Sequence, residues 1–206
     1  MSAAVITYDR RVGRWEADAR GRLEQAALAL YGERGFEQTT VAEIAKRAGL
    51  TERTFFRHFT DKREVLFGRS GELLDFLVTT AASSPESAAP MDVVVEALVA
   101  AGAVFNEQRR DYSRQRQAII AANADLRERE LIKLASMASA MADTLRRRGV
   151  TDPTASLTSE AGIAIFRVAF KRWVDQTNEQ AWPELIRESL DELKLLFAGE
   201  RRSSSA

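Results

Sequence analysis

Residues 40–59, TVAEIAKRAGLTERTFFRHF, combine two short helical patterns with a glycine turn between them. Thr40 and Glu43 have the spacing of a capping box, which satisfies free backbone amides at the start of a helix. Gly49 can take the left-handed conformation that a tight turn needs, and Thr51 is a good cap for the next helix. The stretch therefore predicts two short helices joined by a tight turn, the helix-turn-helix plan.

Outward from this stretch, apolar residues recur every three or four positions along the chain, which is the period of an α-helix. The sequence has four prolines, and no alternating β-branched run bounded by turn residues is present. We therefore predict an all-α protein. The pattern predicts a helix that ends at Gly35, a helix from Lys62 to about Ala82, and a nearly all-apolar helix from Met91 to Phe105 at the centre of a bundle.

Composition narrows the classes of function. The 206 residues carry 30 Lys and Arg against 30 Asp and Glu, so any contact with nucleic acid must come from a local patch. Residues 1–69 hold thirteen of the basic residues and ten of the acidic ones. With no cysteine and one histidine, we expect no thiol chemistry, no metal site and no cofactor. Signal peptides and membrane spans are also absent, which predicts a soluble, cytoplasmic protein without a membrane partner.

Polar segments are expected at both ends of the sequence, around two helical domains. We expect a flexible basic arm over residues 1–19, with Arg10, Arg11 and Arg14 able to reach DNA, and a helix-turn-helix domain over 20–66. A second helical domain should follow over 67–200, to which the resemblance described below assigns effector binding and dimerisation, with a disordered tail over 201–206.

The outward face of the helix after Thr51 carries hydrogen-bond donors, since Phe55 and Phe59, four residues apart, hold the opposite face to the core. Donors on a short helix of this kind suit the major groove of DNA, which is about 12 Å wide.

Residues 22–67 closely resemble the DNA-binding domain of TetR-family transcriptional regulators. Their sequence is RLEQAALALYGERGFEQTTVAEIAKRAGLTERTFFRHFTDKREVLF. The shared features are the RGF turn, the TTVAEIAKRAGL helix and turn, TFFRHF and the DK that follows. The resemblance implies a homodimer with an N-terminal three-helix DNA-binding domain and a helical-bundle domain that binds an effector. Phe56 stands where the family usually has Tyr, so a phenol-to-phosphate hydrogen bond would be absent.

Chemistry and resemblance together assign roles. Arg53 and Thr54 are predicted to contact base edges. Phosphate contacts are expected from Thr40, Thr51, Arg57, His58 and Lys62, and Phe56 completes the predicted DNA-binding set.

Large apolar side chains in the second domain are candidates for an effector pocket, which favours an apolar or amphipathic small molecule. They are Phe105, Tyr112, Met137, Met141, Phe166, Phe170 and Trp173. Packed core is the alternative role for each of them.

Two late helices have apolar faces too wide for one packing partner, which favours an isologous dimer interface. The residues predicted there are Ile163, Phe166, Phe170, Ile186, Leu190, Leu193 and Phe197.

The sequence thus predicts a transcriptional regulator, not an enzyme, whose dimer binds a palindromic double-stranded DNA operator. A repressor that a small-molecule effector releases is the favoured form, with activation in place of repression left open by the sequence. The alternative is a helical-bundle carrier or enzyme without DNA binding. A carboxylate-metal bundle would need Glu-x-x-His pairs, and position 55, three residues before the single His58, is Phe.

Overall fold

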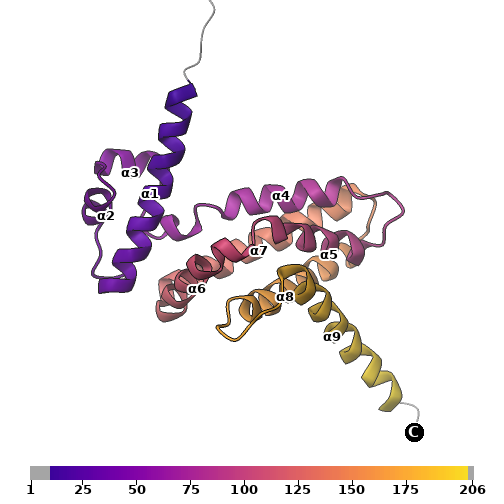
Figure 1. The fold of residues 1–206 in the computed structure, drawn as a ribbon. Helices are drawn as coiled ribbons and strands as arrows, with labels where there is room; N and C mark the ends of the chain where they lie inside the picture. The colour runs from indigo at the N-terminus through magenta and orange to yellow at the C-terminus, as the bar shows by residue number, and fades with distance from the viewer. Residues whose placement is uncertain (1–9, 204–206) are drawn as a thin grey trace, which may run out of the picture. The chain divides into compact units, whose positions relative to one another are not determined.

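The computed structural model describes residues 10–203, with side chains from 19 to 198. Every regular element in that range is helical, which confirms the predicted all-α class (Figure 1).

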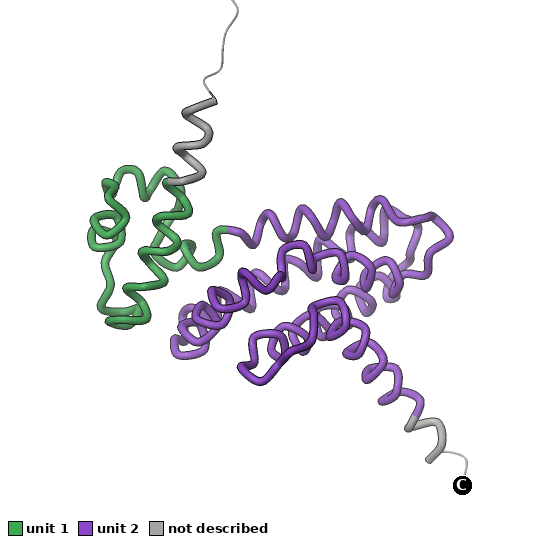
Figure 2. The backbone as a smooth tube through the Cα atoms, viewed as in Figure 1, with its two compact units in different colours: residues 1–68 green, residues 69–206 purple. Residues whose placement is uncertain are grey.

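Backbone contacts divide the chain into two compact units, residues 1–68 and residues 69–206 (Figure 2). Unit 1 contains α1 (Arg10–Arg34), α2 (Val41–Arg47), α3 (Glu52–His58) and the short 3-10 helix η1 (Glu64–Phe67). Unit 2 contains α4 (Ser70–Ala82), α5 (Pro90–Ala100), η2 (Ala101–Ala103), α6 (Glu107–Ala122), α7 (Ala124–Arg147), α8 (Thr154–Trp173) and α9 (Trp182–Ser203).

Both ends of the chain are more helical than expected. α1 begins at Arg10, inside the segment expected to be a flexible arm, and α9 continues to Ser203, past the expected start of the tail. The expectations for residues 1–9 and 204–206 lie outside the described residues, as does the expected reach of the Arg10, Arg11 and Arg14 side chains.

The helix expected from Lys62 to Ala82 is interrupted at Gly68 and Arg69, which separate η1 from α4. Gly68 packs tightly: a Cβ atom there would lie 2.9 Å from Phe59 Cε1 and 3.1 Å from Glu24 Oε1. The Arg20 guanidinium also donates a hydrogen bond to the Gly68 carbonyl oxygen. The contacts with Arg20 and Glu24 join residues more than forty positions apart, so the sequence pattern gives no sign of them.

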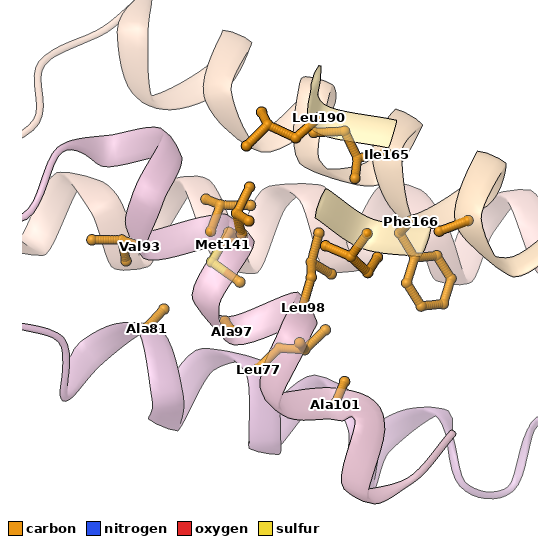
Figure 3. Close-up of a cluster of buried hydrophobic side chains, with 14 of the residues drawn as sticks. Leu77, Ala81, Val93, Ala97, Leu98, Ala101, Met141, Ile165, Phe166 and Leu190 are labelled. Atoms are coloured by element: carbon orange, nitrogen blue, oxygen red, sulfur yellow. The ribbon is translucent and has the colours of Figure 1, made fainter. Parts of the chain in front are cut away.

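Unit 2 is built around α5, as the nearly all-apolar sequence of this helix predicts. Its residues Val93, Val94, Ala97 and Leu98 are buried, and the helix packs against α4, α8 and α9. Figure 3 shows Leu77 of α4, Leu98 of α5 and Ile165 of α8 in one apolar cluster. The helix ends at Ala100, five residues before the expected end, and η2 follows it.

Gly162 allows α8 to approach α5 closely, since a Cβ atom at position 162 would overlap Val94 Cγ1. We expect Gly162→Ala to lower the free energy of unfolding by about 1–3 kcal/mol, because the extra methyl group overpacks the core. Urea denaturation measures this change. Gly71→Ala in α4 is the matched control, since a Cβ there has no neighbour within 4 Å; it should leave stability unchanged or raise it by up to about 1 kcal/mol. Equal stabilities of the two variants would contradict the close approach.

Candidate nucleic-acid interface and effector region

The capping box at the start of α2 is formed. The Thr40 amide donates to Glu43 Oε2 at 2.9 Å, and the Glu43 amide donates to Thr40 Oγ1 at 3.2 Å. The hydrogen bond from the Thr40 backbone is the main reason that the pKa of Glu43 lies below its usual value. The Thr40 side chain, predicted to contact phosphate, is therefore engaged in capping and stays exposed at the end of α2.

The turn between α2 and α3 depends on Gly49, whose φ of 65° lies in the left-handed region. The Leu50 amide donates to the Ala45 carbonyl oxygen at 2.8 Å and closes the turn. Thr51 then caps α3 by accepting a hydrogen bond from the Thr54 amide at 3.2 Å. The predicted helix-turn-helix is therefore present, with the caps and the turn that the sequence predicts.

Burial of Phe55 and Phe59 fixes the rotation of α3 about its axis. The opposite face exposes Arg53 and Arg57, and it leaves Thr54 and His58 half-buried. The Arg53 guanidinium makes no hydrogen bond or ion pair with any described residue, so its five donors are available to a ligand.

Phe56 lies on the same exposed side of α3 and is 55% exposed. Its ring makes an edge contact with Phe55, with the ring centroids 5.4 Å apart. A phenyl ring has no donor for a phosphate, so any contact of Phe56 with DNA would be apolar.

Lys62 differs from Arg53 in that its side chain is hydrogen-bonded to the backbone of unit 1. Its ammonium group donates to backbone carbonyls of the α1–α2 connection and lies 4.3 Å from the Phe36 ring centroid. The α1–α2 pair is also joined by ion pairs from Arg34 to Glu43, at 3.0 Å, and from Arg47 to Glu33.

In unit 2, four of the predicted effector residues form one aromatic cluster. Phe105, Phe166, Phe170 and Trp173 contact one another through their rings. Met137 and Met141 of α7 are buried in the same apolar core, whereas Tyr112 is half-buried on α6 and is not among these ring contacts.

Sequence reasoning missed Trp182 as a fifth member of the aromatic cluster. Its ring stacks on Phe105 at 4.3 Å, and its indole Nε1 donates to the Leu98 carbonyl oxygen at 2.7 Å. Trp182 is also the first residue of α9. The sequence signal that could have pointed to Trp182 is the indole itself, because a buried indole N–H needs a hydrogen-bond acceptor.

Arg110 is the second residue that the sequence did not reveal. Two adjacent arginines on a polar helix indicate a solvated face, but Arg110 is only 7% exposed. Its guanidinium donates to the carbonyl oxygens of Asn178 at 2.8 Å and Gln180 at 3.1 Å, and lies 5.6 Å from the Trp173 ring centroid. Arg110 therefore attaches α6 to the loop between α8 and α9.

Comparison with known proteins identifies the family. The sequence profile described as "Bacterial regulatory proteins, tetR family" matches residues 24–67, and the profile described as "MftR C-terminal domain" matches residues 88–198, more than half of the chain. The chain belongs to the TetR family of transcriptional regulators. This confirms the family that the sequence resembles.

Individual proteins similar to this chain in sequence or fold are consistent with this family. MftR of Mycobacterium tuberculosis, named as a regulator of mycofactocin biosynthesis, is 23% identical over 172 residues, which are 82% of this chain and 86% of MftR. A TetR-family protein of Syntrophomonas wolfei has the same fold, with a TM-score of 0.61 and 16% identity over 87% of this chain and 95% of that one. FadR of Bacillus subtilis, solved with stearoyl-CoA, gives a TM-score of 0.59 and 16% identity over 83% and 95% of the two chains.

The residues predicted for the dimer interface of this TetR-family regulator divide into two groups. Phe166, Ile186 and Leu190 are buried within the protomer, and Ile163, Phe170 and Leu193 are partly buried against the same core. Phe197, in contrast, is 64% exposed. Because α8 and α9 pack on each other and on α5, the wide apolar faces of these helices are used largely inside the protomer.

The described part of the chain lacks two further kinds of feature. It contains no group of three or more Asp, Glu or His side chains arranged to hold a metal ion. None of its helices combines the length and the apolar character that crossing a membrane requires.

We expect Arg110→Met to lower the free energy of unfolding by about 2–3 kcal/mol, because two carbonyl oxygens lose a charged donor. Urea denaturation measures the change, and limited proteolysis should show faster cleavage in residues 174–181. Arg109→Met is the matched control, since Arg109 makes no such bond, and it should stay within about 0.5 kcal/mol of the wild type. The same stability for both variants would show that the Arg110 bonds do not hold the loop.

Proposed function

We propose that this TetR-family regulator is a repressor whose homodimer inserts two copies of α3 into the major groove of a palindromic operator. The observation that carries the proposal is the exposed face of α3, where Arg53 has free donors while Phe55 and Phe59 anchor the opposite face. Arg53 and Thr54 contact base edges, and Thr51, Arg57 and His58 contact phosphates. An arginine that reaches guanine O6 and N7 supplies the most common specific contact in the major groove.

A dimer is supported by apolar side chains that the protomer leaves uncovered on α8 and α9. Five large ones are more than half exposed: Leu157, Val168, Leu195, Leu196 and Phe197. The C-terminal end of α9 extends away from the other helices of unit 2 (Figure 1), and the side chains from Lys194 to Ala198 are exposed. A second copy placed around a two-fold axis would cover this surface with the same surface.

We place effector binding in unit 2, beside the aromatic cluster of Phe105, Phe166, Phe170, Trp173 and Trp182. An apolar or amphipathic molecule suits these side chains, and FadR of B. subtilis, which shares the fold, holds stearoyl-CoA. The effector would favour a dimer in which the two α3 helices no longer match one turn of DNA, about 34–36 Å. A coupling of about 1–3 kcal/mol changes DNA affinity about 5- to 150-fold.

Selection of bound sequences from a random DNA pool tests the DNA-binding part of the proposal. We expect a palindrome with half-sites one helical turn apart. Arg53→Ala should relax preference at one base pair in each half-site, at a cost of about 1–3 kcal/mol, because a direct base contact is lost. No enrichment at low salt would contradict DNA recognition, and unchanged base preference in Arg53→Ala would contradict only the role of Arg53.

Release of the selected DNA by acyl-CoA tests the effector part. Acyl-CoA molecules with chains of 8–18 carbons form a graded series of probes, and free CoA is the matched control without an acyl chain. We expect DNA release that increases with chain length, because each buried methylene contributes about 0.8 kcal/mol. An equal response to CoA and to the acylated forms would contradict an apolar effector site.

A further inference from the structure

Lys62 stands out among the predicted phosphate contacts because its amino group is already surrounded by acceptors. Nζ lies 2.9 Å from the Phe36 carbonyl oxygen, 3.2 Å from that of Thr39 and 3.3 Å from that of Glu37. A lysine ammonium has three N–H donors, and three carbonyl oxygens receive them here. No donor remains for a DNA phosphate while these bonds are formed.

The rest of the Lys62 residue is held as well. The Tyr31 hydroxyl of α1 donates to the Lys62 carbonyl oxygen at 2.6 Å. Tyr31 is buried, and this burial raises the pKa of its phenol, which keeps the hydroxyl a donor. Lys62 also lies over the Phe36 ring, whose negative face attracts the ammonium charge. Both ends of Lys62 are therefore fixed to the region where α1 ends.

The three carbonyls that Lys62 binds belong to residues 35–40, the connection that places α2. The connection begins at Gly35, with a φ of 87°, and ends at Thr40, the cap of α2. Within it, Thr39 is buried and its hydroxyl donates to the Gly35 carbonyl oxygen at 2.9 Å. Three carbonyl dipoles that converge on one point repel one another unless a cation lies between them. The Lys62 ammonium supplies that cation.

We propose that Lys62 is a positioning residue for DNA binding and makes no phosphate contact. It holds residues 36–39, this connection sets the start of α2, and α2 positions α3 through the turn at Gly49. This inference rests on the proposed DNA binding and replaces the phosphate contact that the sequence suggests for Lys62.

The salt dependence of DNA affinity separates a positioning residue from a phosphate contact. Each phosphate neutralised by a protein cation contributes about 0.9 to the slope of log affinity against log salt concentration. Lys62→Met keeps the apolar stem over Phe36 and removes the donors. The measurement is the affinity of the wild type and of Lys62→Met for the selected operator at 50–200 mM salt. The temperature is one at which circular dichroism shows both proteins fully folded.

We expect Lys62→Met to bind about tenfold more weakly with an unchanged salt slope. Tenfold corresponds to about 1.4 kcal/mol, close to the contribution of one charge-assisted hydrogen bond. A slope reduced by about 0.9 for each protomer would show a phosphate contact and overturn the proposal. Unchanged affinity in the fully folded variant would also overturn the proposal. A residue that only stabilises the fold changes the fraction of protein that is folded, and it leaves the DNA affinity of the folded protein unchanged.

Tyr31→Phe provides a second test that holds even if Lys62→Met does not fold. The change removes one buried oxygen and leaves the Lys62 carbonyl oxygen without the Tyr31 donor. We expect weaker DNA binding with the wild-type salt slope, whereas unchanged affinity would contradict positioning through this pair. Failure of the wild type to bind any selected sequence would overturn the proposed function and the role of Lys62 with it; the variant results bear on Lys62 alone.

Discussion

Phe55 of α3 and Phe59, the residue directly after this helix, are both buried in unit 1. A seven-residue helix has too few internal hydrogen bonds to persist alone in water, so its existence and its rotation depend on this packing. The two rings contact each other at 5.5 Å between centroids, and Phe56 adds an edge contact from outside. Every property assigned to the exposed face, including the freedom of Arg53, follows from which side of α3 these two phenylalanines occupy.

Local features of unit 1 could be predicted from the sequence because the interactions that create them span few residues. The Thr40 box, the Gly49 turn and the Thr51 cap each join residues three to five apart, and all three are present. The spacing of Phe55 and Phe59 likewise shows the buried face directly, since residues four apart share one side of a helix. The family resemblance rests on the same short stretch.

The features that could not be predicted depend on distant partners. Arg110 bonds to residues about seventy positions later, and Trp182 bonds to a carbonyl 84 positions earlier. Neither charge nor helical period distinguishes a buried arginine from a solvated one, because the distinction lies in which carbonyls the fold brings near it. The same reason explains why Ile186 and Leu190 suggested an interface: an apolar helix face shows that something covers it, whereas only the fold shows that α5 and α8 do so.

Gly68 occupies the last position of unit 1 and differs in kind from the turn glycine Gly49. Its φ of −54° suits any residue, so only the closeness of Phe59, Arg20 and Glu24 excludes a side chain there. A side chain at position 49 would strain the backbone of the turn, whereas one at position 68 would displace the side chains of Phe59, Arg20 or Glu24 from their packing inside unit 1.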